Sequence, residues 1–151
     1  MSHYVNILIA SDLTLETLRL IERARSISTK STKISLVHAV PPVSFTYGGI
    51  SAYVPDMIDY EEVQNNIMDA KKEHVKEMIE YHKLHDVDWD IEVGKPSIVV
   101  KNYATENLCD LILMGSHGEK GLKALLGSTT RAVLHDAPCD VLCVRLFDQE
   151  K

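Results

Sequence analysis

The sequence predicts an α/β fold, a doubly wound parallel sheet of five strands in the order 3-2-1-4-5 with helices on both faces. Short apolar runs alternate with amphipathic helical segments along all 151 residues. Strands that alternate with helices form parallel sheets, because each crossover packs a helix against the sheet with a right-handed turn. No linker or repeat interrupts the pattern, so residues 1–151 are predicted to form a single domain.

Two strands and two helices are predicted in the first half of the chain. Residues 4–10 and 33–40 are apolar, β-rich runs, typical of buried strands. Residues 15–29 place apolar side chains at helical spacing, and residues 58–82 do so over a longer stretch. The inner face of the longer helix is predicted to carry Val63, Ile67, Ala70, His74, Met78 and Tyr81. Residues 43–55 are predicted to be an irregular loop.

Three strands and two helices are predicted in the second half. The strands are expected at residues 87–93, 110–114 and 139–146. Residues 97–107 form a helix that follows a Gly-Lys-Pro turn, since proline favours the first turn of a helix. A last helix is expected over residues 128–135, after a glycine-rich segment.

This glycine-rich segment follows the apolar run 111–114 and predicts a phosphate site. It contains Gly115, Gly118, Gly121 and Gly127, and the last is followed by Ser128 and Thr129. Glycines let backbone N–H groups approach a ligand, and a Gly-Ser-Thr entry to a helix directs free N–H groups at an anion. The segment is neither a Walker A loop nor a G-x-G-x-x-G fingerprint.

Topology points to the same edge of the sheet. In doubly wound sheets ligands bind beyond the carboxyl ends of the strands, where the strand order reverses. Strands 1 and 4 flank that point in a 3-2-1-4-5 sheet. Strand 1 is followed by Ser11-Asp12-Leu13, and strand 4 by the glycine-rich segment.

Four motifs resemble the universal stress protein family, and the likeness spans nearly the whole chain. They are I-L-I-A-S-D-L at residues 7–13, L-V-H-A-V at 36–40, G-S-H-G at 115–118 and G-S-T-T-R-A-V-L-H-D-A-P-C-D-V-L-C-V-R at 127–145. The resemblance implies a Rossmann-like subunit, similar to adenine nucleotide alpha hydrolases. It also implies a cytoplasmic homodimer linked to stress survival and to a protein partner not identified by the sequence.

The nucleotide-binding branch of that family carries G-x2-G-x9-G-Ser/Thr, and the resemblance implies an ATP site, with Mg²⁺ as a companion of the phosphates. In this chain eight residues, not nine, separate Gly118 from Gly127. The residues implied in the nucleotide site are Ser11, Asp12, Ala39, Val40, Met114, Gly115, His117, Gly118, Gly127, Ser128 and Thr129. Asp12 would contact ribose or adenine, Ala39 and Val40 would face adenine through backbone groups, and the glycines would line the phosphates.

Two other functions stay open at this point. One is a nucleotide-free interaction module, favoured by the short spacer. The other is a slow ATP hydrolase or self-phosphorylating protein with Ser128 or Thr129 as acceptor. No nucleophile with a base beside it is placed by the sequence, so no catalytic residue is predicted. His117 is expected to contact phosphate or solvent, and His38 to be a hydrogen-bonded core histidine.

Composition excludes several classes of partner and site. A net charge of −6 argues against nucleic acid, which requires a basic face. No apolar run approaches the ~20 residues of a membrane span. Three cysteines form no disulfide framework, which favours a reducing cytoplasm, and no Cys or His spacing predicts a metal site.

The last strand is predicted to lie at an edge of the sheet. An exposed apolar edge invites pairing with another chain. Pairing with its own copy about a two-fold axis would bury this edge in a homodimer. Coverage of the edge by the C-terminal tail is the alternative. The predicted interface residues are Val141, Leu142, Cys143, Val144 and Arg145.

Overall fold

A five-stranded parallel sheet forms the centre of the protein, and a computed structural model describes it at residues 3–44, 59–116 and 126–145. The strand order is β3-β2-β1-β4-β5, and every pairing is parallel. The strands are β1 Asn6–Ala10, β2 Lys33–Val40, β3 Val87–Val93, β4 Leu111–Gly115 and β5 Asp140–Val144. The predicted fold class and strand order are therefore confirmed.

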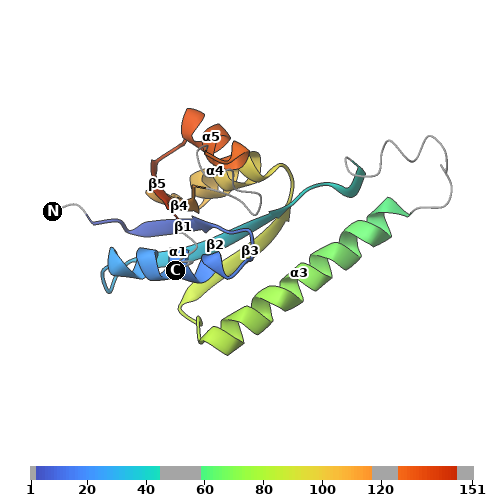
Figure 1. Ribbon diagram of the computed structural model, residues 1–151, viewed down its shortest axis with the longest axis horizontal. Helices are drawn as coiled ribbons and strands as arrows, with labels where there is room; N and C mark the ends of the chain where they lie inside the picture. The colour runs from blue at the N-terminus through green and yellow to red at the C-terminus, as the bar shows by residue number, and fades with distance from the viewer. Residues whose placement is uncertain (1–2, 45–58, 117–125, 146–151) are drawn as a thin grey trace, which may run out of the picture.

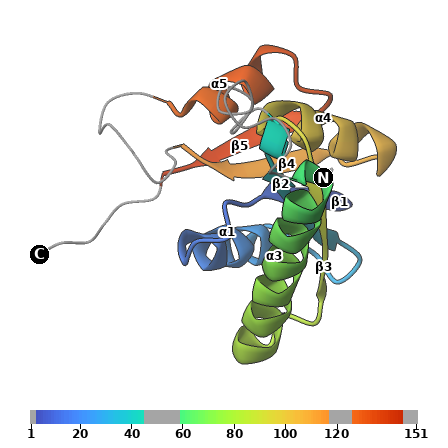
Figure 2. The same ribbon diagram turned by 90° about the vertical axis from the view of Figure 1, so that its right-hand side faces the viewer.

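Helices cover both faces of this sheet. They are α1 Glu16–Ser26, α3 Tyr60–His82, α4 Pro96–Glu106 and α5 Ser128–His135. Figure 1 shows α4 and α5 on one side of the strands and α1 on the other, and Figure 2 shows α3 on the same side as α1. Among the described residues, no helix is both long enough and apolar enough to cross a membrane.

Two hydrophobic cores follow from the alternation of side chains along the buried strands. Ile7 and Ile9 of β1 face α1 and α3, whereas Leu8 between them faces α4 and α5. All three are fully buried. Central parallel strands are covered on both faces, which explains why β1 and β4 are continuous apolar runs in the sequence.

Element boundaries agree with the predicted ones, with small shifts at several ends. β2, β3 and α5 occupy the residues predicted for them. β1 begins at Asn6 instead of at residue 4, because the N–H groups of Val5 and Asn6 donate to the Asp110 carboxylate at 2.8 and 2.9 Å. The Asp110 side chain thus ties β1 to the start of β4 and lies just before that strand.

The inner face of α3 was predicted only in part, since Ile67 and Met78 pack against the first core as expected. Val75 and Ile79 are the buried residues of this helix, whereas His74 and Ala70 are exposed and Tyr81 is 83% exposed. The apolar residues of the helix fit two overlapping stripes at helical spacing. The direction in which α3 crosses the sheet determines which of the two stripes is buried. The N-terminal half of α3 projects beyond the strands (Figure 1).

Candidate functional site at the carboxyl edge of β1 and β4

The candidate site lies where the two central strands end side by side. Ala10, the last residue of β1, pairs with Met114 of β4 and with Val37 of β2. Neighbouring strands lie roughly 4.8 Å apart. The chain leaves β1 toward α1 on one face and leaves β4 toward α5 on the other (Figure 2). This is the switch point at which doubly wound sheets bind ligands.

The loop after β1 is organised by its own polar side chains. Ser11 is buried, its Oγ accepts the N–H of Leu13 at 2.9 Å, and it lies 2.7 Å from Thr17 Oγ1. Asp12 is exposed, and its Oδ1 accepts from the backbone N–H and the hydroxyl of Thr14 at 3.0 and 2.7 Å. Asp12 therefore fixes the local turn and remains at the surface of the site.

The end of β2 forms the neighbouring wall. β2 continues to Val40, beyond the last residue that pairs with β1, which is Val37. The Val40 side chain is buried and its carbonyl accepts the Gly94 N–H at 2.9 Å. Ala39 packs against the second core. A molecule at this edge would thus meet the backbone of Ala39 and Val40 more readily than their side chains.

The start of α5 is attached directly to the end of β4. The Gly127 N–H donates to the Ser116 carbonyl at 3.0 Å, and Thr130 Oγ1 donates to the Gly115 carbonyl at 2.9 Å. Gly127 is the N-cap residue and no side chain caps the helix. The N–H groups of Ser128 and Thr129 are therefore the first-turn donors best placed for an anion, and the helix dipole adds positive potential there.

Ser116 is a residue that the sequence reasoning did not single out. It is 8% exposed, directly follows β4, and its Oγ has no hydrogen-bond partner among the described residues. A buried hydroxyl without a partner costs free energy, so such groups are rare unless a ligand or water completes them. In the sequence, its position between a buried strand and the glycine-rich segment could have marked Ser116 as a candidate site residue.

Two of the predicted site residues, His117 and Gly118, lie outside the described residues. Within the described part of the chain, no three His, Cys, Asp or Glu side chains are grouped so that they could hold a metal ion. The three cysteines are free thiols, and burial raises the pKa of Cys139 to about 11. Cys139 is therefore protonated at neutral pH, which does not suit a metal ligand or a nucleophile.

β5 lies at the edge of the sheet, as predicted. It pairs with β4 on one side only. Val141 and Cys143 pack against the second core, Val144 packs against the first, and Leu142 is 36% exposed. Leu142 is therefore the apolar side chain of this strand most available to another molecule, and the exposed Arg145 follows at its end.

The sheet order and the two helical layers define a protein of the Rossmann-like class. The model of the universal stress protein family matches residues 3–145. Universal stress protein A homolog 2 of Coxiella burnetii is 34% identical, over 97% of this chain and 98% of that protein. The chain belongs to the universal stress protein family.

Solved structures share the fold at lower identity. The universal stress protein UspA of Lactobacillus plantarum superposes with a TM-score of 0.74 at 20% identity, covering 96% of this chain and all of that one. A universal stress protein crystallised in complex with cAMP superposes with a TM-score of 0.61 at 22% identity, covering 95% and 98%.

Proposed function

We propose that this chain is a cytoplasmic stress-response protein that binds an adenine nucleotide, with ATP as the expected ligand, at the carboxyl edge of β1 and β4. The observation that carries the proposal is the buried Ser116 hydroxyl, which has no hydrogen-bond partner in the part of the chain that the structure describes and lies beside the uncapped first turn of α5. Phosphate oxygens are strong acceptors, and one placed there would satisfy the hydroxyl and the helix N–H groups together.

The other groups at this edge suit the remaining parts of a nucleotide. Asp12 is exposed beside the end of β1, where its carboxylate would accept hydrogen bonds from ribose hydroxyls or from the adenine amino group. The backbone of Ala39 and Val40 would face the base. Gly115 and Met114 end β4, on the other side of β1 from β2, and would lie under the phosphates. Mg²⁺ would be held mainly by ATP phosphates, as it commonly is.

The family supports nucleotide binding in general. A universal stress protein of the same fold was solved in complex with cAMP, and ATP and cAMP share adenine, ribose and a phosphate group. Binding at this edge would contact loops from three strands at once, so it would favour one arrangement of them and shift the affinity for a protein partner.

The exposed edge of β5 suits a homodimer. Two copies related by a two-fold axis would pair their edges and bury Leu142, together with the neighbouring predicted interface residues Val141, Cys143, Val144 and Arg145. This pairing would remove an exposed strand edge, which otherwise promotes aggregation.

Native mass spectrometry of freshly purified protein, followed by calorimetric titration with ATP, ADP and cAMP, tests the proposal. A dimer that carries an added nucleotide mass, or that binds one nucleotide per subunit with micromolar affinity, would support it. A dimer without added mass and without binding heat up to millimolar nucleotide would overturn it. That result would favour the nucleotide-free interaction module and make partner capture the next step.

A further inference from the structure

The loop between β1 and α1, residues 11–14, adopts a backbone that requires support. Leu13 has a φ of 61°, in the left-handed region that branched and bulky residues rarely occupy. Its side chain is nevertheless buried. Strained residues of this kind persist where surrounding structure holds them and are common at functional sites.

Side chains of the loop accept two of its N–H groups, and the Thr14 carbonyl accepts the Thr17 N–H at 3.0 Å. Ser11 Oγ accepts the Leu13 N–H, and Asp12 Oδ1 accepts the Thr14 N–H. These bonds shape the turn itself. A backbone bond links the start of the turn to β2, since the Ser11 N–H donates to the Val37 carbonyl at 3.0 Å. The carbonyls of Ser11 and Leu13, on either side of Asp12, are contacted by side chains from other elements.

Two histidines from distant parts of the chain contact the two carbonyls. His38 Nδ1, on β2, lies 2.8 Å from the Ser11 carbonyl oxygen. His74 Nε2, on α3, lies 3.3 Å from the Leu13 carbonyl oxygen. A carbonyl only accepts, so each of these ring nitrogens carries the proton and donates.

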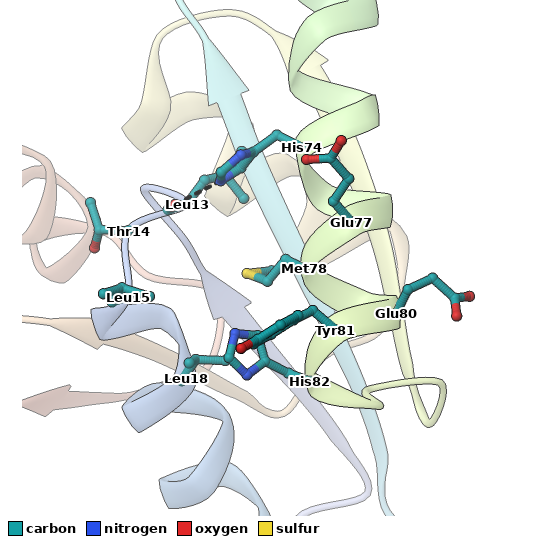
Figure 3. A pocket seen from close by; sticks show the side chains of 10 residues that line it. All are labelled: Leu13, Thr14, Leu15, Leu18, His74, Glu77, Met78, Glu80, Tyr81 and His82. Carbon is teal, nitrogen blue, oxygen red and sulfur yellow. Dashed lines mark hydrogen bonds between the residues drawn. The ribbon is translucent and has the colours of Figure 1, made fainter.

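His74 reaches the loop across an open groove. This groove, of about 850 Å³, separates α3 from the loop and from the start of α1 and is lined by Leu15, Leu18, Met78 and others. Figure 3 shows the His74 ring directed from α3 to Leu13, with its hydrogen bond drawn between them. The bond thus connects two elements that are otherwise separated at this point by the groove.

We infer that His38 and His74 are positioning residues that together hold the β1–α1 loop, and with it Asp12, in the arrangement that receives the nucleotide. The inference rests on the proposed function, because Asp12 contacts a ligand only if a nucleotide binds at this edge. A loop held from both β2 and α3 is already in its bound arrangement. Loss of either bond lowers the fraction of molecules in that arrangement, and the apparent affinity falls by the same fraction.

Conservative substitutions separate this role from mere packing. The amide nitrogen of asparagine lies at the same number of bonds from Cβ as His Nδ1, and that of glutamine matches His Nε2. His38→Asn and His74→Gln keep the donor, whereas His38→Leu and His74→Leu remove it. His85, exposed at the end of the α3–β3 turn, provides matched controls as His85→Asn and His85→Leu.

The first measurement is ATP affinity by calorimetry for wild type and all six variants. Loss of one hydrogen bond predicts roughly three- to tenfold weaker binding for each leucine variant. The asparagine and glutamine variants are expected within about twofold of wild type, like both His85 controls. Leucine variants that bind as wild type, or conservative variants as weak as the leucine ones, would overturn the inference.

The second measurement needs no nucleotide and therefore distinguishes failure of the inference from failure of the proposed function. Amide hydrogen exchange of Leu13 and Thr14 is expected to be several-fold faster in the leucine variants than in wild type, and to be restored by asparagine and glutamine. If wild type binds no nucleotide, the proposed function fails, and this exchange pattern still decides whether the two histidines hold the loop. Exchange that is unchanged in both leucine variants would exclude the support.

Discussion

Thr130 and Gly115 connect α5 to β4 through a hydrogen bond of 2.9 Å from the threonine hydroxyl to the glycine carbonyl. Thr130 is 3% exposed, so this bond is sheltered from water. Gly115 directly precedes Ser116, and Thr130 directly follows Thr129 in α5. The hydrogen bond between Thr130 and Gly115 therefore helps to set the distance between the buried Ser116 hydroxyl and the first-turn N–H groups of α5.

Replacing Thr130 by valine keeps the shape of the side chain and removes this bond. We expect Thr130→Val to lower the free energy of unfolding by about 1 kcal/mol, because the Gly115 carbonyl loses a buried donor. Nucleotide affinity is expected to fall as well, since α5 is less firmly held. Thr130→Ser retains the hydroxyl but loses a buried methyl group, so it should keep ATP affinity in calorimetry and lose roughly 1 kcal/mol in urea unfolding. Wild-type stability and affinity in Thr130→Val would show that the bond does not hold α5.

Ser116→Ala separates a ligand contact from a structural role. The hydroxyl makes no hydrogen bond among the described residues, so its removal should leave the free energy of unfolding unchanged or slightly higher. Affinity for ATP is expected to fall roughly ten- to a hundredfold, the effect of losing one hydrogen bond to a charged group. A stable variant with wild-type affinity would remove Ser116 from the site.

Gly127→Val is expected to weaken ATP binding at least roughly tenfold without unfolding the protein. Gly127 has a φ of −57°, which valine adopts without strain, so a loss of affinity would report a clash with the ligand. Gly94→Val is the contrasting control, because a Cβ at Gly94 would lie 2.8 Å from Val99 Cγ2. Thermal unfolding should show a lowered midpoint for Gly94→Val only. A lowered midpoint for Gly127→Val would mean that its glycine serves the fold.

Leu142→Lys tests the proposed dimer. Its side chain is the most exposed apolar one on β5, and lysine at a strand edge opposes pairing with another chain. Sedimentation equilibrium is expected to show a dissociation constant raised by roughly tenfold or more. Leu108→Lys, at an 81% exposed leucine outside the strands, is the matched control. A dimer unaffected by Leu142→Lys would place the interface elsewhere.

The stability of the protein is expected to fall as the pH drops below about 6.5, the ordinary pKa of histidine, through His38. Burial lowers the pKa of His38, and Lys71 and His74 of α3 lower it further, against the opposing effects of the Ser11 carbonyl and Asp12. The unfolded chain therefore binds the proton at a higher pH than the folded protein does. Stability rises with pH wherever the unfolded state holds more protons, so it is lost as pH falls from the unfolded toward the folded pKa.

Urea unfolding at pH 7.5 and 5.5 measures this effect by comparison with His38→Asn. The variant keeps a donor for Ser11 and lacks the titrating ring, so its loss of stability between the two pH values should be smaller than that of wild type. A loss as large as in wild type would assign the pH dependence to other groups.

The fold could be predicted because local signals determine it. Residues 33–40 and 87–93 are apolar runs of strand length, and the Gly-Ser-Thr sequence at 127–129 places the start of α5. The inner face of α3 could not be predicted in the same way. Val75 and Ile79 are buried because of the path of that helix over the sheet, and helical spacing alone does not distinguish two overlapping stripes.

The sequence by itself determined the alternation of strands and helices, and hence a parallel sheet covered on both faces, since these follow from periodicity, turn residues and the handedness of crossovers. The predicted strand order, and with it the edge position of β5, is confirmed by the pairing of the strands. Only the tertiary structure decided that the Ser116 hydroxyl lies buried beside α5, with no partner among the residues described. It also brought His38 and His74 to the carbonyls of Ser11 and Leu13, across separations of 27 and 61 residues. Bonds over such distances in the chain depend on how whole elements pack, and local sequence patterns carry no information about that packing.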